Sequence, residues 1–179
     1  MLKQNIETLF KEQKKNRPKI EDISGVLLEG DRLKNLLDFV VYLQENKMSP
    51  AWASVNSWKA SYKGKGVCYI KIPYDSVDST NPDSGKNTWY IQPIGYYGDE
   101  CDIIITNDAF KEIVWSCVKQ CNACNGRYTG KKRPCNFGTD RTISGKEFER
   151  VCGYINIKNP NGDVLNFAKM WTEAKKQTI

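Results

Sequence analysis

The 179-residue chain contains no histidine. This absence excludes Ser–His and Cys–His nucleophile pairs within one chain, because both need an imidazole as the general base. The chain also lacks a Walker A loop and a G-x-G-x-x-G motif after a strand. Acid–base catalysis by a carboxylate needs no histidine, but no motif supports it here. The sequence therefore favours a binding protein and leaves enzymatic activity open.

Long apolar runs are absent as well. No stretch approaches the roughly 18 consecutive apolar residues that a membrane-spanning helix needs. The first residues, 1–5, lack the apolar run of a signal peptide. We therefore expect a cytoplasmic protein, in which the seven cysteines are not paired in disulfides. The oligomeric state does not follow from the sequence.

The net charge of +6 raises the question of nucleic-acid binding. The basic residues are spread along the whole chain and do not form a recognised nucleic-acid motif, so a solvated basic surface is the simpler explanation. The local concentration nearest to the cysteines keeps a nucleic-acid or protein interaction as the alternative. It consists of Arg127, Lys131, Lys132 and Arg133.

Hydrophobic periodicity predicts helices first and strands later in the chain. Helices are expected over 2–14 and 20–30, and from an Asp31 N-cap to a stop at Pro50. Residues 58–62 and 67–72 predict a hairpin, followed by strands over 88–94 and 101–106, a helix ending at 117, and a strand over 154–158. Asn159 is expected to cap the last helix, and Pro93 favours an edge strand.

This order of elements predicts an α+β fold. Its largely antiparallel sheet of four to five strands would be packed by helices, with a metal-stapled cysteine loop beside it. We expect an N-terminal helical segment, 1–30, and a single domain, 31–179, that contains a zinc-binding loop over 117–152.

Four cysteines in the last third of the chain have the spacing of a structural metal site. They are Cys121, Cys124, Cys135 and Cys152. Four thiolates suit a closed tetrahedral Zn²⁺ site, which would contribute folding energy and no open catalytic position. The alternatives are an iron–sulfur cluster, a Cys-x-x-Cys redox pair, or reduced cysteines without metal. Cys117 could replace one ligand or be a core residue, and Cys68 is expected to be a buried thiol.

Aromatic residues concentrate on the predicted sheet and suggest a ligand pocket. The predicted ligand-binding residues are Trp58, Tyr62, Tyr69, Trp89, Tyr90 and Glu100. Such rings with a carboxylate would suit planar or cationic ligands. The alternative is that the rings pack in the core of the sheet. A hydrolase that uses Glu100 as its base is a further alternative.

The last third of the chain resembles a group of uncharacterised cysteine-rich bacterial proteins. The resemblance covers the cysteine pattern, Ile143-Ser-Gly-Lys-Glu-Phe148 and Asn159-Pro160. The part from Trp52 to the third strand is similar to gyrase-inhibitor-like and effector-binding domains. The resemblance implies a cytoplasmic module whose concave sheet binds small, often hydrophobic or cationic molecules. We therefore expect a zinc-stabilised small-molecule-binding or sensing module, with the basic metal loop as an alternative interaction site.

Overall fold

The computed structural model describes residues 2–73, 87–94, 108–118, 139–151 and 156–179. The chain divides into two compact units. The first unit consists of Met1–Ile94 and Ile157–Ile179, and the second of Gly95–Asn156. The polypeptide therefore leaves the first unit after Ile94 and returns to it at Ile157.

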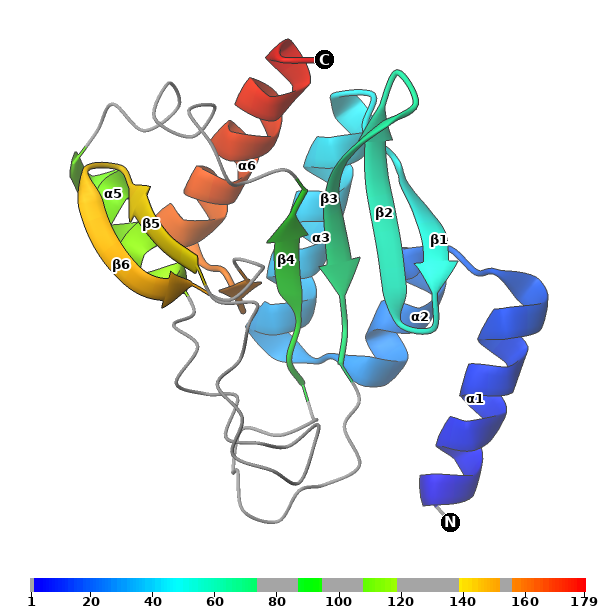
Figure 1. Ribbon diagram of the computed structural model, residues 1–179. Coiled ribbons are helices and arrows are strands. Elements are labelled where there is room, and N and C mark those ends of the chain that lie inside the picture. The colour runs from blue at the N-terminus through cyan, green and yellow to red at the C-terminus, as the bar shows by residue number, and fades with distance from the viewer. Residues whose placement is uncertain (1, 74–86, 95–107, 119–138, 152–155) are drawn as a thin grey trace. The chain divides into compact units, whose positions relative to one another are not determined.

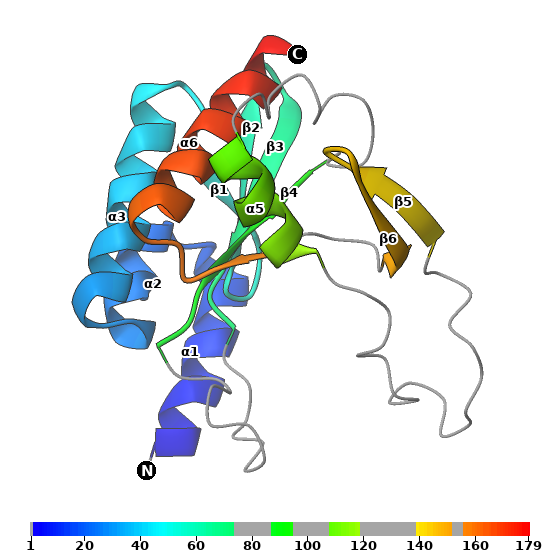
Figure 2. The same ribbon diagram turned by 90° about the vertical axis from the view of Figure 1, so that its left-hand side faces the viewer.

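The first unit is built from helices packed on an antiparallel sheet. Its helices are α1 (Leu2–Asn16), α2 (Ile20–Leu27), α3 (Gly30–Glu45) and α6 (Gly162–Gln177), and its strands are β1 (Pro50–Ser54), β2 (Ser57–Tyr62), β3 (Lys65–Lys71), β4 (Tyr90–Pro93) and β7 (Ile157–Lys158) (Figure 1). The strand order is β1-β2-β3-β4-β7, and every neighbouring pair is antiparallel. Helices α2, α3 and α6 lie on one side of this sheet (Figures 1 and 2). The predicted α+β fold with a largely antiparallel sheet is confirmed.

The core of the first unit lies between this sheet and its helices. One row of side chains crosses the strands, because Trp58 pairs with Ile70, Ile70 with Ile91, and Ile91 with Ile157. All four residues are fully buried. Helix α3 covers them with Leu36, Phe39, Val40 and Leu43, which recur at the spacing of one helical face. The apolar periods seen in the sequence thus define the face of the sheet that the helices cover.

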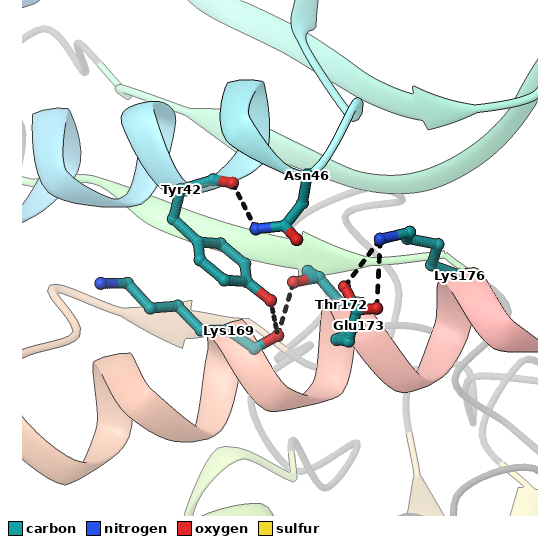
Figure 3. A network of polar contacts seen from close by, with 6 residues as sticks. All are labelled: Tyr42, Asn46, Lys169, Thr172, Glu173 and Lys176. Carbon is teal, nitrogen blue, oxygen red and sulfur yellow. Dashed lines mark hydrogen bonds and ion pairs between the residues drawn. The ribbon is translucent and has the colours of Figure 1, made fainter.

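Polar contacts join α3 to α6 at the edge of this core (Figure 3). The Tyr42 hydroxyl donates to the Lys169 carbonyl at 2.9 Å, and Thr172 donates to the same oxygen at 2.8 Å. The Lys169 ammonium pairs with Asp38 at 2.6 Å. Burial raises the pKa of Tyr42 above its ordinary value, so the hydroxyl remains a proton donor. This network fixes the final helix against α3.

Two predicted helix starts are wrong. Helix α3 is preceded by Glu29 as its N-cap, so Asp31 lies in the first turn, where a carboxylate favours the helix dipole. Helix α6 has Asn161 as its N-cap. The Asn159 side chain instead accepts from the backbone N–H of Trp89 at 2.9 Å, while the Asn159 N–H donates to the Trp89 carbonyl at 2.8 Å. Asn159 therefore ties the chain to Trp89, the residue before β4, ahead of the start of the helix.

Two expectations about prolines also change. Pro50 follows the helix, as expected, but it is also the first residue of β1, a strand that the sequence analysis did not predict. Pro93 lies in β4, an interior strand of the sheet. In the described residues, however, strand β7 pairs with Tyr90 and Ile91 and does not extend as far as Pro93. The missing N–H of Pro93 therefore costs no ladder hydrogen bond to β7.

The second unit contains a hairpin inside the segment expected to be a loop over 117–152. Strands β5 (Thr139–Ile143) and β6 (Lys146–Val151) pair antiparallel around a Ser144-Gly145 turn in which both residues have positive φ. The Trp115 indole of helix α5 (Asp108–Cys117) donates to the Ile143 carbonyl at 2.8 Å. Phe148 and Val151 are buried. Part of the expected loop thus has regular structure and apolar contacts of its own.

None of the helices in the described ranges is long and apolar enough to cross a membrane.

Candidate ligand-binding face of the sheet

The second face of the five-stranded sheet carries lysine and tyrosine side chains. Side chains alternate along a strand, so the neighbours of the buried residues Trp58, Ile70 and Ile91 point to the opposite face. None of the described helices of the first unit lies on this side (Figure 2). Lys158 is exposed there and the other members are half-buried. The set, called the lysine–tyrosine face below, consists of Lys59, Tyr69, Lys71, Tyr90, Gln92 and Lys158.

Strand register arranges this face in two cross-strand rows. In one row Tyr69 pairs with Lys59 on one side and Gln92 on the other. In the next row Tyr90 pairs with Lys71 and Lys158. Directly paired residues have Cβ atoms about 4.5–5.5 Å apart, and diagonal neighbours are about 7–8 Å apart. Each tyrosine therefore has at least one lysine beside it, and the two rings lie on adjacent strands at diagonal positions.

Lys71 connects the two rows. Its ammonium nitrogen lies 5.6 Å from the centre of the Tyr69 ring, within the range of a cation–π contact. Partial burial lowers the pKa of Lys71, because the ammonium loses some of its hydration. A ligand anion would replace that hydration and favour the charged form. A negative group beside Lys71 would therefore meet an ammonium that is only partly hydrated.

Gly66 makes room for Lys59 on this side of the hairpin. A Cβ atom added to Gly66 would lie 2.6 Å from Cε of Lys59 and 2.8 Å from Cδ1 of Ile94. Carbon atoms of real side chains do not approach each other so closely. The Lys59 side chain therefore passes over Gly66 in a position from which a larger residue would displace it. The glycine in β3 therefore helps to position a lysine of the adjacent strand.

The two sides of the first unit differ in charge. The five strands contain four lysines, Lys59, Lys65, Lys71 and Lys158, and no aspartate or glutamate. Every described acidic residue of this unit lies in a helix or, for Glu29, at a helix cap. The lysine–tyrosine face therefore presents positive charge without an acidic residue on its own strands, and it suits an anionic group.

The predicted ligand-binding residues do not share one face. Trp58 and Trp89 are fully buried on the helix side. The Trp58 indole donates to the Pro18 carbonyl at 2.9 Å, and the Trp89 ring packs 6.3 Å from that of Phe39. These two tryptophans take the alternative role of core packing.

The tyrosines of the predicted set divide as well. Tyr62 lies between two lysines, with the Lys63 ammonium 5.1 Å and the Lys176 ammonium 5.4 Å from its ring centre. Tyr69 and Tyr90 belong to the lysine–tyrosine face. Glu100 lies outside the described residues. Of the five predicted residues that the structure describes, it thus brings two together, Tyr69 and Tyr90.

Sequence reasoning did not select the lysines of this face. Lys59, Lys71 and Lys158 each stand beside a buried strand residue, namely Trp58, Ile70 and Ile157. The period of two places them opposite the core, so this signal was present in the sequence. Their grouping, however, depends on the pairing of β4 with both β3 and β7.

The predicted zinc ligands Cys121, Cys124, Cys135 and Cys152 lie outside the described residues, as do Arg127 to Arg133. Among the residues that the structure does describe, no group of three metal-binding side chains occurs. Cys117 ends α5 half-buried, and burial raises the pKa of its thiol. The zinc site stays a prediction.

Cys68 is a buried thiol, as predicted. It lies on the helix side of β3, where it pairs with Ala60 of β2 and Pro93 of β4. Burial raises the pKa of this thiol to about 12. A thiol in this state is protonated at neutral pH and has no access to a solution reagent. Cys68 is therefore a small core residue.

A separate cavity of about 560 Å³ lies in the second unit. It is lined by Asp108, Lys111, Glu112, Trp115, Ser144 and Gly145. Lys111 pairs with Asp108 at 2.8 Å within the first turn of α5, and this bond lowers the pKa of the carboxyl. The two opposite charges are already paired with each other. The strands that carry the lysine–tyrosine face, in contrast, contain lysines and no aspartate or glutamate.

No protein-family model matches this chain, and no curated protein and no solved structure matches it either. The resemblance to cysteine-rich bacterial proteins and effector-binding domains therefore stays a prediction.

Proposed function

We propose that this protein is a binding module for a planar, anionic ligand of the nucleotide type. The observation that carries the proposal is the row in which Tyr90 stands between Lys71 and Lys158 across three adjacent strands. An aromatic ring offers a stacking surface to a base, and the flanking ammonium groups offer charge to a phosphate. One ligand with both groups would engage the whole row.

The proposal keeps the expected binding role of the sheet and changes the charge of the ligand. The sequence predicts a planar, hydrophobic or cationic ligand, from the resemblance and from Glu100 near the rings. The described face supplies lysines instead, which favours an anion. Catalysis is not part of the proposal, because the described residues of this face include no carboxylate or histidine that could act as a general base. The predicted structural zinc would support folding of the second unit and is independent of this role.

The test is isothermal titration calorimetry with adenosine 5′-monophosphate. We expect binding that is lost in Tyr90→Ala and in Lys71→Gln, and kept in Lys34→Gln, which removes an exposed lysine of α3 on the helix side. Adenosine tests the ring without the phosphate, and inorganic phosphate tests the charge without the ring. We expect both to bind at least tenfold more weakly than the nucleotide.

Two results would refute the proposal. One is a nucleotide affinity that Tyr90→Ala and Lys71→Gln leave unchanged, since the ligand would then bind elsewhere. The other is equal affinity for inorganic phosphate and the nucleotide, which would show that the ring contributes nothing.

A further inference from the structure

The lysine–tyrosine face has two aromatic positions, and a mononucleotide needs only one. Tyr69 and Tyr90 lie on β3 and β4 at diagonal sites, about 7–8 Å apart. At this separation one base cannot stack on both rings. A ligand that uses both tyrosines must therefore carry two planar groups.

The lysines extend over more strands than one nucleotide covers. Lys59 stands on β2, Lys71 on β3 and Lys158 on β7, so positive charge lies on both sides of the tyrosine pair. Beyond Lys59 the hairpin continues to the exposed residues Lys63 and Lys65. A chain of nucleotides, in which bases alternate with phosphates, matches this alternation of rings and charges.

From these observations we infer that the lysine–tyrosine face binds single-stranded nucleic acid. Two consecutive bases stack on Tyr69 and Tyr90, and the phosphates between and beside them contact the three lysines. The inference rests on the proposed function and adds the polymer as the ligand. Sheets that present aromatic side chains to successive unpaired bases are an established means of binding single strands. Gln92, beside Tyr69, adds a donor and an acceptor for a base edge.

The same geometry favours single strands over a duplex. The rings lie on an antiparallel sheet at separate positions, and the bases of a duplex are stacked on one another and unavailable to them. Duplex DNA would meet the lysines alone. The face should therefore prefer single strands over a duplex of the same length.

The experiment is fluorescence anisotropy with labelled oligonucleotides and the full chain. The length series consists of one, two, four and ten thymidine nucleotides, a matching uridine series, and a ten-base-pair duplex. We expect affinity to rise roughly 5- to 150-fold from one nucleotide to two, because a second base then stacks on a second ring. The DNA and RNA arms identify which strand is preferred, and binding of either one supports the inference.

Variants separate stacking from charge. Tyr69→Ala should lower the affinity for the two-nucleotide ligand by the same roughly 5- to 150-fold factor that the second nucleotide contributes. It should leave the affinity for one nucleotide, which stacks on Tyr90, within about twofold of that of the natural protein. Tyr69→Phe keeps the ring and should bind as the natural protein does. With three lysines engaged, the slope of log K against log salt should be about −2, and Lys158→Gln should make it shallower by about 0.7. Lys34→Gln should not change the slope.

The outcomes test the nucleotide-binding proposal and the single-strand inference separately. Mononucleotide binding without a gain at two nucleotides refutes the single-strand inference and leaves the proposed function intact. Two other results also refute it. One is equal affinity for duplex and single strand, and the other is an affinity for long strands that Tyr69→Ala leaves unchanged, since charge alone would then explain the binding. Absence of binding by every ligand, including the mononucleotide, refutes both. Thermal unfolding of each variant shows whether a loss reflects the site or the fold, and Tyr69→Phe gives a readout even if Tyr69→Ala is unstable.

Discussion

A buried pair of amides should decide whether α1 stays attached to the sheet. The Gln13 side chain of α1 donates to Oδ1 of Asn56 at 2.6 Å and accepts from the Asn56 backbone N–H at 2.8 Å. Asn56 lies in the turn between β1 and β2 with φ +54. Gln13 is 1% exposed and Asn56 is 7% exposed. The variant Gln13→Ala therefore leaves two buried polar groups of Asn56 without their partner.

The cost follows from these two groups. Each buried donor or acceptor that loses its partner costs about 1–3 kcal/mol, so the free energy of unfolding should fall by about 2–6 kcal/mol. Urea unfolding followed by tryptophan fluorescence measures the loss, because Trp58, Trp89 and Trp171 are buried. The matched control is Gln177→Ala at an exposed position of α6, which should cost less than about 0.5 kcal/mol. A loss of less than 1 kcal/mol for Gln13→Ala would refute the idea that this pair holds α1.

Two further predictions concern the cysteines. Purified protein should contain about one zinc ion per chain, and Cys124→Ser should lower that content; elemental analysis that finds neither zinc nor iron, with all thiols reacting freely, would contradict the predicted site. For Cys68, the folded pKa of about 12 exceeds the ordinary 9.0. The unfolded chain thus releases a proton that the folded chain keeps, and the free energy of unfolding should fall by about 1.4 kcal/mol per pH unit above pH 9. Urea unfolding at pH 8 to 10.5 tests this slope against Cys68→Ala, and equal slopes would contradict it.

Much of the first unit follows from its hydrophobic periods. The apolar spacing of α3 and the hairpin of β2 and β3 are both found where the sequence predicts them. Strand β1 was missed because Pro50 marks the end of a helix and the strand that follows has small residues such as Ala51 and Ser54. Its pairing with β2 depends on tertiary structure, which the pattern of five consecutive residues does not specify.

The second unit shows a different limit. The dominant sequence signal there is the spacing of four cysteines, which led the whole segment to be interpreted as one loop. Strands β5 and β6 contain few apolar residues, so their alternation is weak. The Ser144-Gly145 turn between them was the available signal, because positive φ at two central residues is typical of a tight hairpin.

The candidate site was only half predictable for a geometric reason. Trp89 and Tyr90 are consecutive in the chain, so a strand must place them on opposite faces, and the sequence alone could have separated them. Which face is covered by helices depends on the packing of α3 and α6. The meeting of Lys71, Tyr90 and Lys158 depends further on β7, which comes from the far end of the chain. No pattern within one segment contains that information.

The absence of carboxylates from the five described strands of the first unit is difficult to explain by stability alone. Opposite charges across neighbouring strands stabilise a sheet by about 0.2–1 kcal/mol per pair, so a glutamate in place of Tyr90 would pair with a lysine on each side. The described acidic residues of the first unit lie instead on its helices or at a helix cap, as the Asp38–Lys169 pair illustrates. The strands of the lysine–tyrosine face contain no such cross-strand pair of opposite charges, and Lys71 is partly dehydrated. A ligand that carries negative charge would complement the lysines of these strands, and a ligand that also carries planar groups would explain why the positions between the lysines are aromatic.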